Sequence, residues 1–157
     1  MFAEVSDDVV NILASERVTV NAHQFCIVDE NLKSHNLTSD WRVMSYSTDE
    51  NGLVFISSIE HARYPFYGTQ FHPETIPFEW RKSSDIPHTS DALKANRHFM
   101  DFFVKESRKS LHYFADKEEE DQHLIYNYAP KFSGALGGYY EQLYVFEPRD
   151  IISKFLF

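Results

Sequence analysis

Two strand patterns joined by an Asn-Gly turn are the feature that most constrains how this chain can fold. Residues 42–48 and 53–59 are rich in β-branched and aromatic side chains, which favour extended backbone on a half-buried sheet. Between them, Asn51 and Gly52 tolerate the positive φ angles that a tight turn requires. The sequence therefore predicts an antiparallel hairpin in this part of the chain.

A third extended segment, residues 66–71, follows the hairpin and is predicted to form a buried strand. This strand must end before Pro73, because proline has no N–H to donate to a neighbouring strand. A strand that stops there places His72 and Glu74 just beyond its end. Both side chains can then project from the edge of a sheet.

Two helices are predicted around these strands. A short one begins after Ser6, whose hydroxyl can cap it, and Asp7 and Asp8 suit the positive end of its dipole. A longer one covers about residues 90–109, where the side chains that recur at helical spacing are Leu93, Asn96, Phe99, Met100, Phe103 and Val104. The remaining segments are predicted to be a short strand at 18–20, an irregular polar stretch at 21–40, a covering loop at 75–88, a charged connector at 117–121 and two aromatic segments at 124–132 and 139–146.

Composition limits the classes of function. The chain has 157 residues, a length that fits one domain, and 43% of them are apolar, which is enough for a core. Its net charge is −9 and its Lys and Arg residues are scattered, so we expect no nucleic-acid partner, since holding phosphates needs a basic patch. We also expect no membrane span, because no apolar run reaches roughly 18 residues. The acidic residues 1–8 lack the pattern of a signal peptide.

His72 and Glu74 form the candidate catalytic pair. An imidazole at this position can take a proton from a nucleophile and return it to a leaving group. A nearby carboxylate can hold the imidazole in one tautomer and stabilise its protonated form. Residue type alone favours a simpler interpretation, in which His72 is a surface histidine beside a turn proline. The surrounding residues decide between that interpretation and a catalytic role.

The segment Gln70-Phe71-His72-Pro73-Glu74 resembles the end of the catalytic-histidine strand in the class I glutamine amidotransferase-like superfamily. Within it, the chain is most similar to the γ-glutamyl hydrolases, and Glu79-Trp80 and the Phe-Phe-Val-x-Glu-x-Arg pattern at 102–108 narrow the resemblance to them. It extends to about residue 146 and includes Asn21-Ala22-His23, Phe55-Ile56-Ser57, Tyr64-Pro65, Tyr67-Gly68-Thr69 and Leu124-Ile125-Tyr126-Asn127-Tyr128.

This resemblance implies an α/β fold, part of a three-layer sandwich with a central, mostly parallel sheet in addition to the antiparallel hairpin. Residues 1–157 would form a single partial domain, the C-terminal part of a γ-glutamyl hydrolase domain. Such enzymes cleave γ-linked glutamate from folylpolyglutamates through a thioester, using a Cys-His-Glu triad. By motif position, His72 is the general base and acid, Glu74 orients it, and His23 lies near the substrate, although a loop histidine without a role is an equal interpretation of His23. No metal or other cofactor is implied.

The nucleophile of the family is missing from this sequence. The resemblance implies a Gly-x-Cys-x-Gly elbow, which places the cysteine beside backbone donors for the oxyanion, and no such segment occurs here. Cys26 is the single cysteine and has no flanking glycines, so we interpret it as a structural thiol rather than a nucleophile. We therefore expect the chain alone to be inactive, and to be poorly soluble if the strand at 66–71 keeps an exposed edge.

Three interpretations stay open at this point. The first is that the chain is part of a hydrolase. The resemblance then implies a lysosomal or secreted protein that is often a homodimer. The glycosylation motif Asn36-Leu37-Thr38 suits the secretory route. The second is a non-catalytic relative that binds a glutamate-containing ligand or a protein partner, although keeping both His72 and Glu74 weakly argues against it. The third makes Cys26 a relocated nucleophile. The last residues, 151–157, have no counterpart in the resemblance.

Overall fold

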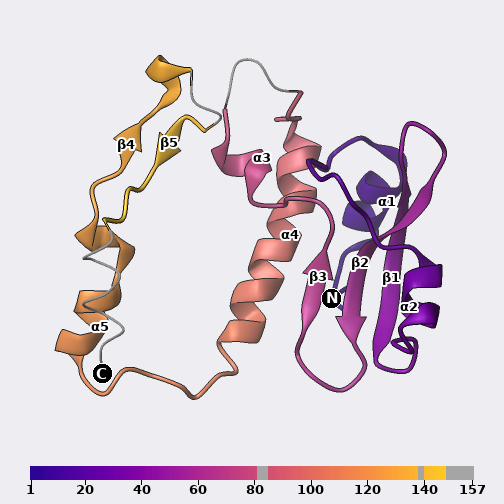
Figure 1. Ribbon diagram of the computed structural model, residues 1–157, viewed down its shortest axis with the longest axis horizontal. Helices are drawn as coiled ribbons and strands as arrows, with labels where there is room; N and C mark the ends of the chain where they lie inside the picture. The colour runs from indigo at the N-terminus through magenta and orange to yellow at the C-terminus, as the bar shows by residue number, and fades with distance from the viewer. Residues whose placement is uncertain (81–84, 138–139, 148–157) are drawn as a thin grey trace. The chain divides into compact units, whose positions relative to one another are not determined.

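The computed structural model describes residues 1–80, 85–137 and 140–147, which fall into two compact units (Figure 1). The first unit comprises Met1–Phe78 and Asp85–Ser110. The second comprises Glu79–Ser84 and Leu111–Phe157. The end of the chain that sequence analysis left without a counterpart lies outside the described residues.

The first unit contains a three-stranded antiparallel sheet in the order β1-β2-β3. β1 (Trp41–Thr48) and β2 (Val54–His61) form the predicted hairpin. β3 (Tyr67–Thr69) pairs with β2 where a strand is predicted before Pro73. It is shorter than the predicted range 66–71, and none of its three residues is buried, because it lies at the edge of the sheet. The fold is thus a mixed α/β arrangement with a small antiparallel sheet, and the strands that the structure describes include no parallel pair.

Asp49 and Gly52 make the turn of the hairpin. The Asp49 carboxylate accepts hydrogen bonds from the backbone N–H groups of Asn51 and Leu53 at 2.9 and 2.8 Å. Gly52 has a φ of 85°, in the left-handed region where a side chain would be strained. The turn chemistry of the sequence is therefore confirmed, with the positive φ on the glycine.

Two capped helices pack in the first unit. α1 (Asp7–Ser15) begins after Ser6, whose hydroxyl accepts from the Val9 N–H, as predicted. α4 (Ser90–Ser107) begins after Thr89, which caps it by accepting from the Ala92 N–H at 3.1 Å. Figure 1 shows α4 running alongside β3, and the rings of Tyr67 and Phe102 meet there at 4.8 Å.

The core of the first unit consists of two small clusters. The first packs α1 and α4 against the residues after β3 and contains Ile12, Val18, Ile76, Ala92 and Ala95. The second contains Met1, Phe71 and Phe99. The clusters include Phe71 and Ile76, so buried side chains flank the candidate catalytic residues on both sides in the sequence.

Several segments predicted to be irregular contain short helices. These are α2 (Asp29–Ser34) in the polar stretch, α3 (Thr75–Phe78) in the covering loop and α5 (Lys117–His123) in the charged connector. α5 forms because Asp116 caps it by accepting from the Glu119 N–H at 2.8 Å. Residues 18–20 are not a strand, and the structure holds them by single hydrogen bonds instead.

The second unit has little core. It contains α5, two 3₁₀ turns (Ile125–Asn127 and Gly134–Leu136) and the antiparallel pair of β4 (Lys131–Phe132) with β5 (Gln142–Leu143). Of its described residues only Ser133 is buried. The two aromatic segments of the sequence thus run mostly along the surface.

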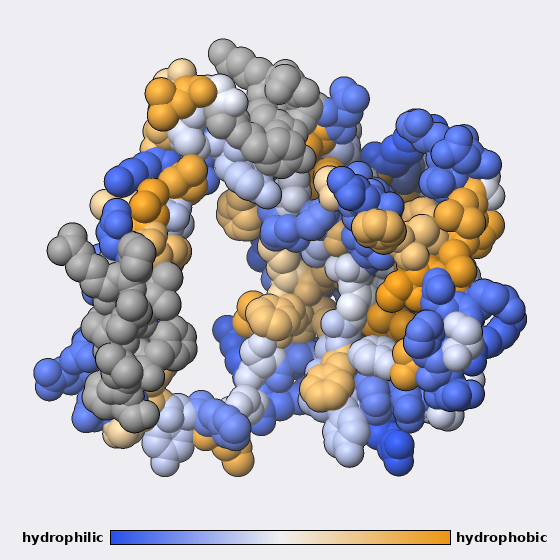
Figure 2. Space-filling view, in the orientation of Figure 1, coloured by the Kyte–Doolittle hydropathy of each residue, from blue (hydrophilic) through white to orange (hydrophobic). Residues whose placement is uncertain are grey.

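The first unit also leaves apolar side chains uncovered. Figure 2 shows hydrophobic side chains gathered over β1 and β2, where Ile27, Leu53 and Val54 are each about half exposed. Ile27 reaches this region because its carbonyl accepts from the Ile56 N–H of β2 at 2.8 Å. The sheet therefore presents an apolar surface to solvent.

Candidate active site

His72 and Glu74 face each other just beyond the end of β3. Nδ1 of His72 lies 2.9 Å from Oε1 of Glu74. An ionised carboxylate only accepts hydrogen bonds, so in the neutral imidazole the proton lies on Nδ1 and the lone pair on Nε2. Nε2 is then available to take a proton from a group placed beside it. The structure thus brings together the two residues that sequence analysis proposed as base and orienting carboxylate.

Three contacts fix the backbone that leads from β3 into this pair. Before it, the Gln70 N–H donates to the Ser57 carbonyl of β2 at 2.8 Å, and the His72 N–H donates to the Val20 carbonyl at 2.9 Å. Between these two bonds, the buried ring of Phe71 packs edge-on against Phe99 at 5.0 Å. The direction of the His72 side chain is therefore set by a sheet bond, a core contact and a bond to a second segment.

The pair itself is open to solvent. The side chains of His72 and Glu74 are 44% and 62% exposed. A hydrogen bond in this environment contributes little to folding stability, because water competes for both groups. Both side chains of the pair are therefore partly accessible from solvent.

His23 and Cys26 do not join the pair. Nε2 of His23 lies 3.2 Å from the Asn21 amide oxygen, and its ring stacks edge-on against Phe55 of β2 at 5.7 Å. Cys26 is a free, half-buried thiol. No hydrogen bond or ring contact among the described residues connects either of them to His72. The substrate contact predicted for His23 stays a prediction.

An apolar hollow of about 260 Å³ lies next to Glu74, between β3 and α4. Its wall combines the end of β3 with one face of α4 and includes Tyr67, Gly68, Pro73, Phe99, Met100, Phe102 and Phe103. Sequence analysis placed Phe99 and Phe103 on one helical face but gave no sign that the face would border the carboxylate. This contact depends on how α4 packs against β3.

Tyr67, Glu106 and Lys109 form a polar link between β3 and the end of α4. The Tyr67 hydroxyl donates to Glu106 Oε2 at 3.2 Å, and Lys109 Nζ donates to Oε1 at 2.6 Å. Burial, and then the charge of Glu106, raise the pKa of Tyr67. The hydrogen bond from Lys109 is the main reason that the pKa of Glu106 is lowered. Sequence analysis did not find this link, because its partners are 39 positions apart.

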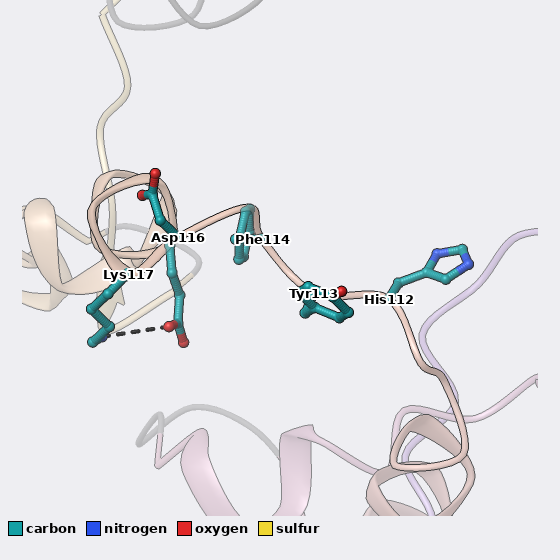
Figure 3. A pocket seen from close by; sticks show the side chains of 6 residues that line it. His112, Tyr113, Phe114, Asp116 and Lys117 are labelled. Carbon is teal, nitrogen blue, oxygen red and sulfur yellow. Dashed lines mark ion pairs between the residues drawn. The ribbon is translucent and has the colours of Figure 1, made fainter.

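A second hollow lies in the second unit and has a different character. Figure 3 shows His112, Tyr113 and Phe114 spread along an extended segment. Lys117 pairs with Glu120 at 3.5 Å. Tyr113 is 90% exposed. The side chains do not converge on a common point, so we assign no site to this hollow.

Neither a metal centre nor a membrane span is found in the parts of the chain that the structure describes. Within them, no group of three or more His, Cys, Asp and Glu side chains could hold a metal ion. Over the same ranges, every helix is too short or too polar to cross a bilayer.

Comparison with known proteins places this pair in a family context. The profile of the family "Glutamine amidotransferase class-I" matches residues 3–84, which include His23, His72 and Glu74. The chain is 35% identical over 147 residues to gamma-glutamyl hydrolase of Rattus norvegicus, covering 93% of this chain and 46% of that protein. It is 37% identical over 148 residues to the Bos taurus protein of the same name (94% and 46%) and 32% identical over 152 residues to gamma-glutamyl hydrolase 1 of Arabidopsis thaliana (96% and 43%). The chain spans about half the length of the curated relatives it matches.

Proposed function

The chain belongs to the class-I glutamine amidotransferase family, and we propose that it supplies the histidine and glutamate of a hydrolase that cleaves γ-linked glutamate from folylpoly-γ-glutamates. The observation that carries this proposal is the 2.9 Å contact between His72 and Glu74, inside the segment that matches the family. The similarity to relatives named gamma-glutamyl hydrolase supports the choice of substrate. No cofactor is required by this chemistry.

In the proposed reaction, His72 moves a proton twice. Its Nε2 takes the proton of a cysteine thiol, and the thiolate attacks the carbonyl carbon of the γ-linked amide. The C–N bond breaks, the proton passes from His72 to the leaving amine, and a thioester remains. His72 then takes a proton from water, whose oxygen attacks the thioester carbonyl. The C–S bond breaks, and His72 returns the proton to the released thiolate. Glu74 holds the Nδ1–H throughout and stabilises the imidazolium.

The cysteine of this reaction is not provided by residues 1–157 in the proposal. Cys26 has no elbow around it and makes no described contact with His72. Loss of even one oxyanion donor costs on the order of 10²–10³ in rate, so the chain alone is expected to be inactive. The nucleophile and its donors would belong to polypeptide that the relatives have and this sequence lacks.

The same proposal extends to the fold and the setting. The chain would be one part of an α/β domain with three layers, in which a mostly parallel sheet completes the antiparallel strands seen here. Residues 1–157 would then form a single partial domain. A homodimer and a lysosomal or extracellular location also remain predictions from the resemblance.

A non-catalytic relative is the second candidate, and one observation favours it. Large apolar side chains are uncovered, among them Phe78 and Phe103 at 76% and 68% exposure, which is typical of a surface that contacts another polypeptide. In this case His72 and Glu74 would face a protein partner or a glutamate-containing ligand without cleaving it.

The experiment that separates these candidates begins with the intact mass of the native protein, followed by an assay of glutamate release from a folylpoly-γ-glutamate. We expect release by a longer protein that contains these residues, and its loss in His72→Ala. His35→Ala is the matched control, because His35 is an exposed histidine at the end of α2. Release by the 157-residue chain alone, or release that survives His72→Ala, would contradict the proposal.

A further inference from the structure

Asn96 is the most deeply buried polar side chain of α4, with no exposed surface. Its Nδ2 donates to two carbonyl oxygens, at 2.6 Å to Val18 and at 2.8 Å to Ala92. Since both partners only accept, the nitrogen end of the amide must face them. Its Oδ1 is buried without a hydrogen-bond partner among the described residues, which is unfavourable. The favourable part of this side chain is therefore its pair of donated bonds.

Only one of these two bonds leaves the helix. Ala92 is one turn earlier in α4, so that bond is local. Val18 is 78 positions away, in a segment that belongs to no strand. Because the segment lacks a ladder of backbone bonds, the bond from Asn96 and the core packing of the Val18 side chain together hold it in place.

The Val18 segment in turn holds His72. The Val20 carbonyl accepts from the His72 N–H at 2.9 Å. A continuous path of two hydrogen bonds and two residues of backbone therefore runs from Asn96 to the candidate base. The backbone that follows Glu74 is also held by α4, because Ile76 is fully buried against Ala92 and Ala95 of that helix.

We propose that Asn96 is a positioning residue for His72: its amide fixes residues 18–20, and the Val20 carbonyl then fixes the backbone of His72 so that Nδ1 meets Glu74. Asn96 touches no reacting atom in this role. The contact between His72 and Glu74 is too exposed to hold itself, and a shift of about 1 Å in a catalytic group can cost on the order of 10²-fold in rate. The catalytic meaning of this role rests on the proposed function, but the geometric claim does not.

The test uses the complete 157-residue chain and two variants of Asn96. Asn96→Leu keeps a similar volume and removes both donors. Asn96→Ser keeps a hydroxyl with a single donor, which can bond to the Ala92 carbonyl one turn earlier but cannot make both bonds. Ile12→Val is the matched control, because Ile12 belongs to the same core cluster and makes no side-chain hydrogen bond.

Two NMR readouts distinguish positioning from general stability. The first is the hydrogen-exchange protection of the His72 amide relative to that of Gln70, which is bonded to the sheet instead of to Val20. We expect this ratio to fall about tenfold in both Asn96 variants, the order of effect of one lost hydrogen bond, and to stay constant in Ile12→Val. The second is the ¹⁵N signature of the His72 ring, whose Nδ1–H tautomer should lose population in the Asn96 variants alone.

An unchanged protection ratio in both Asn96 variants, or an equal fall in Ile12→Val, would overturn the proposal. If neither Asn96 variant folds, the unaltered chain decides: the side-chain amide of Asn96 and the backbone amide of His72 must then exchange through one opening, with the same dependence on urea. If the side-chain amide of Asn96 exchanged freely while the backbone amide of His72 stayed protected, the proposal would be overturned. These readouts need no turnover, so they stand or fall separately from the hydrolase proposal.

Discussion

The two units of the chain differ in how they are held together. The first has two clusters of buried side chains, an antiparallel sheet and two capped helices around His72 and Glu74. The second is richer in aromatic residues for its length, yet Tyr113, Tyr126 and Leu136 are 90%, 88% and 89% exposed. Apolar composition therefore does not create a core by itself, because the side chains must also converge on one face. Only the first unit meets that condition in the described residues.

The largest predicted difference between the units is in the stability lost when one phenylalanine of each is replaced by alanine. Phe99 is 6% exposed and packs against Phe71, whereas Phe132 is 67% exposed on β4. Phe99→Ala should lower the free energy of unfolding by about 3–5 kcal/mol, because it leaves a cavity. Phe132→Ala should change it by less than about 0.5 kcal/mol. Urea denaturation followed by far-UV circular dichroism measures both.

The same pair of variants can also break the comparison. An equal loss of stability in Phe132→Ala would mean that the second unit has a core to which Phe132 contributes. A small loss in Phe99→Ala would mean that the cluster around Phe71 can collapse to fill the space. Either result would remove the distinction between the units.

A smaller effect is predicted for the caps of one helix in each unit. Thr89 caps α4 and Asp116 caps α5 by accepting from backbone N–H groups at 3.1 and 2.8 Å. Replacing either residue by alanine removes about 1 kcal/mol from its helix. For Thr89→Ala the loss should appear in the urea midpoint, because α4 packs in the core of the first unit. For Asp116→Ala it should appear only as local helix loss, measured by hydrogen exchange over residues 117–123.

Thr89→Ser and Asp116→Asn keep a capping oxygen and are the matched controls. Both should retain the properties of the unaltered chain to within a few tenths of a kcal/mol. A shift of the urea midpoint in Asp116→Ala equal to that in Thr89→Ala would show that α5 unfolds together with the first unit. That outcome would contradict the separation of the two units.

Sequence patterns predicted the local parts of the fold and missed the parts that depend on distant partners. The hairpin, the strand before Pro73, the cap at Ser6 and the long helix follow from short-range turn and capping chemistry, and all are present. The run of acidic residues at 117–121 predicts a connector, whereas Asp116 caps this segment as the helix α5. Phe103 was placed correctly on the apolar face of α4, but that part of the face is exposed.

The candidate site shows the same division. His72 and Glu74 could be found from sequence because they are neighbours whose motif is recognisable. Asn96 was visible only as a polar residue on an apolar helical face, because its partner Val18 is brought to it by folding. The uncovered surface over β1 and β2 was equally unpredictable, since it depends on which elements cover the sheet. The sequence therefore predicts the candidate catalytic residues but not the distant contacts that hold them in place.

The smallest predicted effect is electrostatic and belongs to the first unit. The hydrogen bond from Lys109 lowers the pKa of Glu106 below its usual value of 4.5. A lowered pKa in the folded state means that the folded chain binds fewer protons than the unfolded chain, so the pair adds stability above about pH 4.5. That contribution is lost as the pH falls through the lower, folded value. Glu106→Gln removes the titrating group and should abolish this part of the pH dependence.

The measurement is a pair of thermal unfolding series, one for the unaltered chain and one for Glu106→Gln, between pH 7 and pH 3. The unaltered chain should be slightly more stable at neutral pH, and the difference should close as the acid limit is approached. The effect is small because Lys109 is 65% exposed, so solvent and salt screen the pair. Glu118→Gln in the second unit is the matched control, because no hydrogen bond or ion pair is described for Glu118 there. An identical pH response in the two variants would show that the Tyr67–Glu106–Lys109 link does not help to hold β3 against α4.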